Sequence, residues 1–395
     1  MRTHLMPLLS LLGASTIALG CGSHPNVQCG VNSDCDLHLG GACTTAPTEN
    51  QWCSYPDPSC PGGMRYSDLQ VGDGVSGQCV VIEIDAGAPP SAPATSCIAL
   101  PHTCGPNGSD DCCSSLLVPG GTYFRSYDVA GDSGAGDKSA PATISTFRLD
   151  KYEVTVGRFR AFVEASQGTQ ENPPVTGAGT HIRLPGSGWE ASWTQFLPAN
   201  KAVLITSLKC GATFNHSTWT DVPGPNENLP INCLTWYDAM AFCAWDGAFL
   251  PTEAEWNYAA AGGDQQRAYA WSSPPSSIVL DTSHASYDCI EDENAGCTLH
   301  DIVDVGTRPL GDGRWGQSDL TGNAMEWTLD WGDPYQNPCI DCAILGSSLQ
   351  SGGERAIRGG NWTTDMVVQL RTGYRQTASP GEASPDRGMR CARAP

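Results

Sequence analysis

Positive charge is scarce in this chain of 395 residues. Lysine and arginine together number 21, against 42 aspartates and glutamates, so the formal net charge at pH 7 is -21. An acidic surface repels phosphate backbones and anionic lipid headgroups, so this charge argues against nucleic-acid binding and against electrostatic docking on membranes. The acidic residues form no run of like charge, and solubility is therefore their simplest role.

Long apolar runs are rare as well. Only residues 5–19 form one, after Arg2, and a positive start followed by a short apolar segment is typical of a signal peptide. Ala18-Leu19-Gly20-Cys21 then resembles a lipoprotein cleavage site, although Leu19 stands where a small residue is usual. We predict a signal peptide over residues 1–20 and export to the cell envelope. A lipid on Cys21, inserted in the outer membrane, is the expected anchor, and simple secretion is the alternative.

Common catalytic signatures are missing. The sequence has no His-Glu-x-x-His motif, no Gly-x-Ser-x-Gly elbow and no phosphate-binding loop, and its eight histidines are scattered. These absences argue against zinc proteases, serine hydrolases of the elbow type and nucleotide-binding enzymes.

Cysteine is abundant, with 19 residues, and export permits disulfides. Without Cys21, ten cysteines lie between Cys29 and Cys113, and eight lie between Cys210 and Cys391. Even numbers in both sets predict separately bridged domains.

The composition predicts three parts after the signal peptide. Residues 21–80 form a cysteine-rich module with too few aliphatic residues for a core, so disulfides are expected to hold it. Zinc binding is the alternative there, although the cysteine spacings do not suit it. Residues 81–113 contain a proline-rich linker and a second cysteine cluster, in which adjacent Cys112 and Cys113 should reach different partners. Residues 114–395 are rich in glycine and proline and predict a loop-rich α+β domain, with helices starting after Thr155, Thr235 and Thr252.

Six motifs in this last part, in order, resemble the sulfatase-modifying-factor family, which contains the formylglycine-generating enzymes. They are 119–123 with 149–155, 230–239, 250–256, 322–327, 358–361 and 388–391. The resemblance runs from about Val118 to Arg393 and implies a fold related to the C-type-lectin-like folds.

The resemblance also implies a calcium site. By position, its ligands would be the carboxylates of Asp319 and Glu326 and the carbonyls of Gly322 and Ala324. Calcium takes several oxygen ligands from flexible loops, so the chemistry is suitable, and a solvated turn is the alternative.

Disulfide pairing in this domain is predicted from two sources. The resemblance implies Cys243 with Cys391, and nearest-neighbour spacing suggests Cys210–Cys233, Cys289–Cys297 and Cys339–Cys342. Cys339 and Cys342 form a Cys-x-x-Cys motif, for which a structural bridge is favoured over a redox pair because no βαβ pattern surrounds it.

The family's oxidase chemistry uses two copper(I)-binding cysteines, whose positions here hold Thr364 and Gln369, and Asn361 replaces a nearby serine. Neither replacement forms a thiolate, so copper oxidation is not expected. The resemblance places Asn361, Arg371, Arg375, Asp386 and Arg390 around the cleft that holds the catalytic centre in the family's enzymes.

We therefore predict a monomeric, calcium-stabilised scaffold for a protein, peptide or glycan ligand. The alternative is a family enzyme with a rearranged centre that oxidises a sulfatase cysteine to formylglycine, or performs a related oxidation.

Overall fold

The computed structural model describes residues 28–29, 35, 41–45, 50–57, 64–69, 75–80, 94–98, 100–131, 137–210, 216–292, 294, 296–346 and 353–395. It divides into two units, Met1–Ile84 and Asp85–Pro395. The predicted signal peptide and the lipidated Cys21 lie outside the described residues. Within the described part, no helix has the length and apolarity needed to cross a membrane.

The smaller unit is a three-stranded antiparallel sheet, with the order β1 (Ala42–Thr45), β2 (Gln51–Pro56) and β3 (Met64–Tyr66). Disulfides Cys29–Cys43 and Cys35–Cys53 cross it, and Cys79 is also disulfide-bonded. The sulfurs of Cys29, Cys35 and Cys53 lie within 4.8 Å of one another. Because each sulfur already belongs to a disulfide, none is available as the thiolate that zinc requires.

The described residues of the larger unit form three small sheets rather than one large one. The first has the strand order β13-β7-β4, the second β5-β6-β9 and the third β11-β10-β8-β12. The strands of the first two are β4 (Ser115–Val118), β5 (Gly121–Phe124), β6 (Pro141–Ile144), β7 (Phe147–Asp150), β9 (Cys339–Ile340) and β13 (Ala392–Arg393). The third sheet consists of β8 (Met325–Trp331), β10 (Arg355–Arg358), β11 (Gln376–Ala378) and β12 (Arg387–Gly388).

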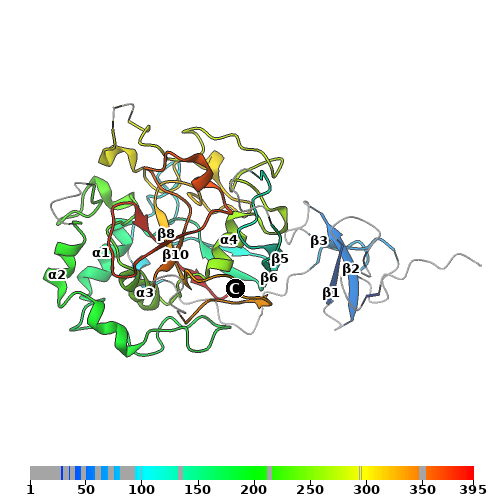
Figure 1. Cartoon of the computed structure of the whole chain (residues 1–395), viewed down its shortest axis with the longest axis horizontal. Coiled ribbons are helices and arrows are strands. Elements are labelled where there is room, and N and C mark those ends of the chain that lie inside the picture. Colours follow the sequence, from blue (N-terminus) through cyan, green and yellow to red (C-terminus); the bar gives the residue numbers. More distant parts are fainter. Residues whose placement is uncertain are drawn as a thin grey trace, which may run out of the picture. The chain divides into compact units, whose positions relative to one another are not determined.

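In the part of this unit that the structure describes, four α-helices accompany the sheets: α1 (Val156–Glu164), α2 (Lys201–Ser207), α3 (Trp236–Trp245) and α4 (Glu253–Ala260). The helices α1 and α2 lie on the side of the unit away from β5 and β6, and α4 lies close to β5 and β6 (Figure 1). Short 3₁₀ helices punctuate the loops at Thr95–Cys97, Ala191–Phe196, Pro225–Asn228, Gly263–Gln265, Leu299–Asp301, Pro309–Gly311 and Val367–Leu370. The loop-rich α+β architecture is confirmed.

The predicted helix starts are confirmed by their caps. The side-chain oxygens of Thr155, Thr235 and Thr252 each accept a hydrogen bond from the backbone N–H three residues later. For α3 and α4 the acidic residue at that third position also accepts from the N-cap backbone, which completes a capping box. The helix α2 was not predicted.

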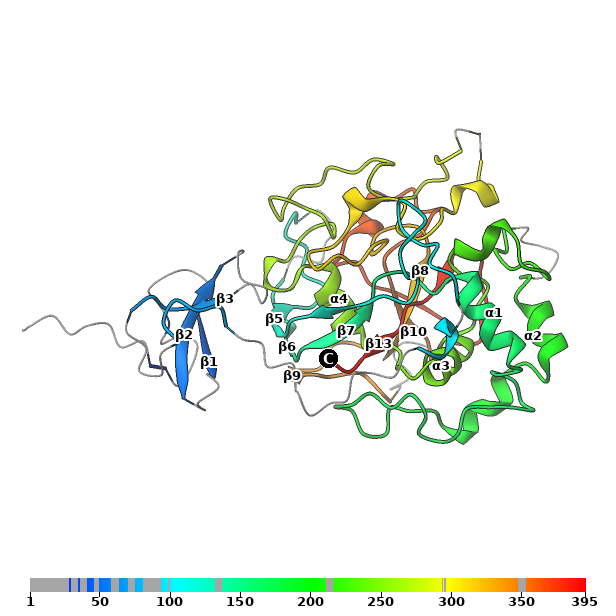
Figure 2. The ribbon, with the colours of Figure 1, turned by 180° about the vertical axis from the view of Figure 1, so that it is seen from behind.

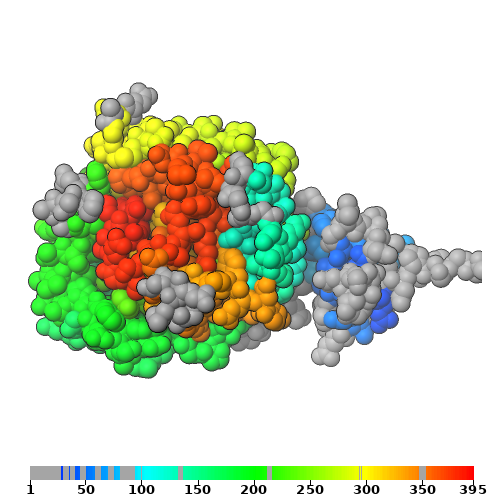
Figure 3. Space-filling view, viewed as in Figure 1, coloured from blue at the N-terminus to red at the C-terminus, as the bar shows by residue number. Residues whose placement is uncertain are grey.

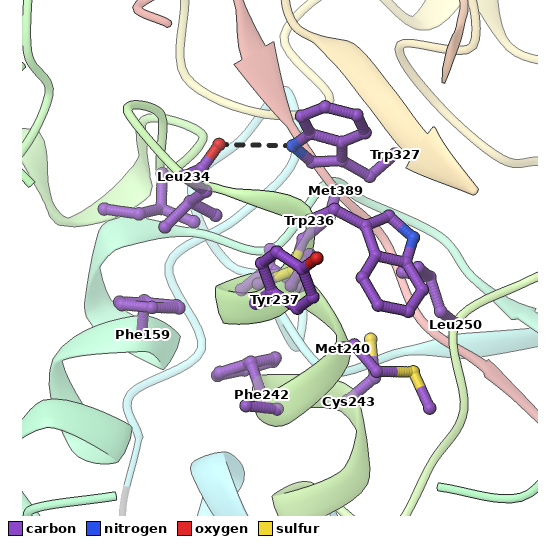
Figure 4. Packing of buried hydrophobic residues seen from close by; sticks show 14 of the residues in the cluster. Phe159, Leu234, Trp236, Tyr237, Met240, Phe242, Cys243, Leu250, Trp327 and Met389 are labelled. Atoms are coloured by element: carbon purple, nitrogen blue, oxygen red, sulfur yellow. Dashed lines mark hydrogen bonds between the residues drawn. The ribbon is translucent and has the colours of Figure 1, made fainter. Parts of the chain in front are cut away.

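Large aromatic side chains fill the core between α1, α3 and the third sheet (Figure 4). Trp236 and Trp327 are fully buried, and each indole N–H donates to a backbone carbonyl, of Thr328 at 2.8 Å and of Leu234 at 3.2 Å. Tryptophan therefore supplies apolar volume and also satisfies buried carbonyls, one in strand β8 and one in the loop before α3.

The second cysteine cluster belongs to the larger unit, although its composition predicted a segment separate from the domain. Cys97 pairs with Cys113 and Cys104 with Cys112, so the adjacent cysteines do reach different partners. Ser96 donates its backbone N–H to Asp246 at 2.7 Å. Asp246 belongs to a fully buried network with Asp150, Arg158 and Arg393, which ties this segment to α1 and β13.

The eight cysteines between Cys210 and Cys391 form the four expected bridges: Cys210–Cys233, Cys243–Cys391, Cys289–Cys297 and Cys339–Cys342.

A buried carboxyl at the start of α3 makes a pH-dependent contribution to stability. Burial raises the pKa of Asp238 from 3.8 to about 6, and its Oδ1 has no hydrogen-bond partner. Because the folded protein binds this proton more tightly than the unfolded chain does, the stabilising contribution of Asp238 is fully present below about pH 4. It is lost as the pH rises through about 6. In Asp238→Asn, the loss of unfolding free energy between pH 4 and 7 should be smaller by up to about 3 kcal/mol. Parallel pH profiles for the two proteins, measured by urea unfolding, would contradict this.

Candidate functional site

The segment that matches the family's catalytic region follows strand β10. Gly360 turns the chain there with a φ of +67°, which favours glycine, and a Cβ at this position would also crowd Leu370 Cδ2 at 2.6 Å. Figure 3 shows a hollow in the surface between two C-terminal segments, coloured red and orange-red. The chain after Gly360 belongs to the orange-red one.

Thr364 and Gln369 occupy the two positions where the family's enzymes have cysteines. The Thr364 hydroxyl accepts from the backbone N–H of Asn361 at 3.0 Å, and Asn361 Oδ1 accepts from the Thr363 N–H and hydroxyl at 2.8 Å. Gln369 lies in the 3₁₀ helix Val367–Leu370, half-buried, and its Oε1 accepts from Gln376 Nε2 at 3.3 Å. These side chains stabilise a turn and offer no thiolate.

No other thiol of the described residues can take their place. The seventeen cysteines that the structure describes are all disulfide-bonded. One cystine does reach this segment, because Cys289 donates its backbone N–H to the carbonyl of Trp362 at 2.9 Å. Its sulfur is bonded to Cys297. Copper(I) selects thiolates, so the described part of the site lacks the ligands of a copper centre.

The charged residues expected around the cleft do not form one set. Arg371 is buried, packs on the Tyr269 ring at 4.9 Å and lies 3.7 Å from Asp128. Arg375 donates to the carbonyls of Trp331, Gly332 and Asp333. Asp386 is half-buried, 3.6 Å from Arg387. Asn361 is only 4% exposed and is therefore buried beneath the surface.

Arg390 corrects the expectation most clearly, because its side chain is fully buried and lines no cleft. It donates to both Glu326 oxygens at 2.7, 2.8 and 2.9 Å, and to the carbonyls of Asp150, Lys151 and Ser318. The alignment with the family could not reveal this burial, because a position in the sequence does not show whether its side chain lines a cleft or lies beneath the surface.

The loop expected to bind calcium is tightly wound, with positive φ at Asp319, Gly322 and Asn323. Glu326 does not fit the ligand role expected of it. Its two oxygens already accept three bonds from Arg390 and one from the Trp256 indole at 2.8 Å, which fills the positions that an ion would need. Calcium binding by the other three residues stays a prediction.

Glu153, which the sequence motifs did not single out, stabilises this loop from the side of β7. One of its oxygens accepts from the Ala324 N–H at 2.8 Å and the other from Asn323 Nδ2 at 2.7 Å. Burial, together with the charges of Asp319 and Glu326, raises the pKa of Glu153. Burial also raises the pKa of Asp319, to about 6. The sequence did contain one signal for a buried role of Glu153. It is a charged residue between Tyr152 and Val154, which belong to the motif at residues 149–155.

The comparisons with known proteins agree with the sequence motifs. A model of the sulfatase-modifying factor enzyme 1-like domain matches residues 102–395. The formylglycine-generating enzyme of Streptomyces coelicolor is 29% identical over 302 residues, which cover 70% of this chain and 88% of that protein. The inactive C-alpha-formylglycine-generating enzyme 2 of Mus musculus is 26% identical over 293 residues, covering 70% and 84%.

Among solved structures, PvdO from Pseudomonas aeruginosa aligns with a TM-score of 0.49 and 20% identity, over 78% of this chain and 100% of that one. The family model spans most of the chain, including the capped helices and the segment with Thr364 and Gln369. The chain therefore belongs to the sulfatase-modifying-factor family.

Proposed function

We propose that the larger unit is a binding module that keeps the family's fold without its copper oxidase centre. The pair Thr364 and Gln369 carries this proposal, because a hydroxyl and an amide stand where copper(I) needs thiolates. The bonding of all described cysteines in disulfides supports it, since none of them is a substitute ligand. A relative named as inactive supports it too, because it is similar to this chain over 293 residues.

The ligand in this proposal is a protein segment, a peptide or a glycan that binds at the hollow between the two C-terminal segments in Figure 3. The segment that contains Thr364 exposes Met366 and Val367, 55% and 48% accessible, next to its hydrogen-bonded turn. Exposed apolar side chains in this segment suit binding better than proton transfer or redox chemistry.

The proposal places the monomeric protein outside the cytoplasm, held by a lipid on Cys21 or secreted. The disulfides support an oxidising compartment, because cytoplasmic thiols are kept reduced. A calcium ion on the Asp319 carboxylate and the carbonyls of Gly322 and Ala324 remains part of the proposal, without Glu326.

An oxidation assay tests the proposed loss of activity. The full chain is incubated with a Cys-x-Pro-x-Arg peptide, copper and a reductant, and the peptide mass is followed. The expected result is an unchanged peptide, because the family's two copper positions hold Thr364 and Gln369, which provide no thiolate. Conversion of the cysteine to formylglycine would overturn the proposal and favour an enzyme with a rearranged centre.

A gain-of-function variant tests the same site from the other side. Thr364→Cys with Gln369→Cys should bind copper(I) at least about tenfold more tightly than the wild type, measured by competition with a chromophoric chelator. The matched control is Thr364→Ser with Gln369→Ser, which changes side-chain size without adding a soft ligand. Equal affinities for the two variants would show that these positions do not form the copper site.

A further inference from the structure

The Cys339–Cys342 bridge is held in place by contacts that do not involve its sulfurs. Strand β9 pairs in parallel with β6, where Cys339 lies opposite Ala142, and Figure 2 shows the two strands side by side. In the turn between the cysteines, the Asp341 carboxylate accepts from the Ser145 N–H at 2.6 Å and from its hydroxyl at 2.7 Å. The Asp341 N–H donates to the carbonyl of Thr143 at 3.0 Å. The turn should therefore keep its geometry when the sulfur–sulfur bond is reduced.

A buried cation faces one of the two sulfurs. Arg125 is 3% exposed, and its Nη1 donates to Cys342 Sγ at 3.4 Å. Its other donors go to the carbonyls of Ala140 and Gln336 and to Asn337 Oδ1, and it forms no ion pair with any carboxylate in the described part of the chain. The Tyr335 ring packs over Arg125 at 4.4 Å and Asp330 attracts it without direct contact. The disulfide sulfur at its Nη1 is only a weak acceptor, so no anion of the described residues contacts the guanidinium charge. A thiolate at Cys342 would compensate it.

The two cysteines also differ in exposure. Residue Cys339 is 3% exposed, whereas residue Cys342 is half-buried. Ile340, between them, is 70% exposed and offers an apolar contact to a partner. By contrast, Cys243 and Cys391 are both fully buried, and their bridge is closed to exchange.

We propose that Cys339–Cys342 is a redox-active pair that oxidises a dithiol of an exported partner protein. A partner thiolate attacks Cys342 Sγ, which forms a mixed disulfide and releases the Cys339 thiolate, which takes up a proton. The partner's second thiolate then attacks the partner's first sulfur, which is bonded to Cys342 Sγ in the mixed disulfide. This step releases Cys342 as a thiolate beside Arg125. Two electrons pass from the partner to the pair, and the partner gains a disulfide.

A redox titration of the full chain tests this proposal, with dithiothreitol as the dithiol. The chain is equilibrated at graded ratios of reduced to oxidised reagent, quenched with acid and alkylated, and each cysteine is quantified by peptide mass. Cys339–Cys342 should be half-reduced at a ratio at least about tenfold less reducing than Cys210–Cys233 or Cys289–Cys297, with near-UV circular dichroism unchanged. Reduction of all bridges together, or loss of the native spectrum with this one, would overturn the proposal.

Matched single-cysteine variants separate the role of Arg125 from mere exposure. Cys339→Ser leaves Cys342 free, and Cys342→Ser leaves Cys339 free. At pH 7, Cys342 should react with iodoacetamide at least about tenfold faster than Cys339, and its rate should reach half-maximum at a lower pH than the ~8.5 of a free thiol. Adding Arg125→Met to Cys339→Ser should move that half-maximum back upward. A half-maximum for Cys342 at or above the free-thiol value in Cys339→Ser would refute the assignment, whether or not the Arg125 variant folds.

Discussion

Replacing Arg390 with methionine is expected to lower the free energy of unfolding by about 3–5 kcal/mol, the usual cost of leaving a buried charge without its partner. The guanidinium holds both oxygens of Glu326 and also donates to three carbonyls. Glu153 and Asp319 are buried nearby, and the charge of Arg390 lowers the pKa of each against the effect of burial. Methionine fills the volume but removes the guanidinium charge from beside these three carboxyl groups. Urea unfolding followed by tryptophan fluorescence measures the loss.

An exposed ion pair supplies the control. Lys209 lies 2.8 Å from Asp221, and both side chains are largely exposed. Lys209→Met should therefore cost less than about 1 kcal/mol. The double variant Arg390→Met with Glu326→Gln should recover part of the loss, since it removes one of the unpaired charges. If Arg390→Met and Lys209→Met proved equally mild, the buried carboxyl groups would have to be neutral or solvated, and Arg390 would not be the cation that stabilises them.

Removing the Cys243–Cys391 disulfide with alanine at both positions is expected to cost about 5 kcal/mol, because the bridge closes a loop of 148 residues. Cross-linking residues that are far apart in sequence removes much of the conformational entropy of the unfolded chain. Cys243 lies on α3 and Cys391 just before β13, and both are fully buried. The loss should appear as a lower urea midpoint and melting temperature.

The Cys289–Cys297 bridge is the matched comparison, because its cysteines are only 8 residues apart. The same loop-closure relation gives about 2–3 kcal/mol for its replacement by alanine. A similar loss for both double variants would contradict the entropic explanation and would place the effect in the packing of the sulfur atoms instead.

Local features were predicted well from the sequence. Thr155, Thr235 and Thr252 start helices because a side-chain oxygen caps a backbone N–H three residues away, and that contact needs no distant partner. The bridges of the larger unit were also correctly expected, since the close pairs follow from spacing and Cys243–Cys391 follows from the family resemblance. The helix α2 was missed because its exposed positions, including Val203, obscure the periodicity.

The candidate site was predicted less completely. Residue identity at Thr364 and Gln369 was enough to exclude a thiolate pair, because that conclusion depends on the side chains alone. The cleft around them was not predictable in the same way. Arg390 was placed at its wall, yet it lies beneath the surface, and Glu153 was not considered although it holds the loop at Asn323.

The sequence by itself determined the family, the start of three helices, the disulfide pairs between Cys210 and Cys391, and the lack of thiols at the family's copper positions. These features depend on residue identity and on short or family-specific spacing. Only the tertiary structure decided that Arg390 neutralises Glu326, 64 residues away, and that Arg125 faces Cys342, 217 residues away. The reason is physical: a buried charge is stabilised by whichever group the fold brings beside it, and that neighbour is set by packing rather than by distance along the chain.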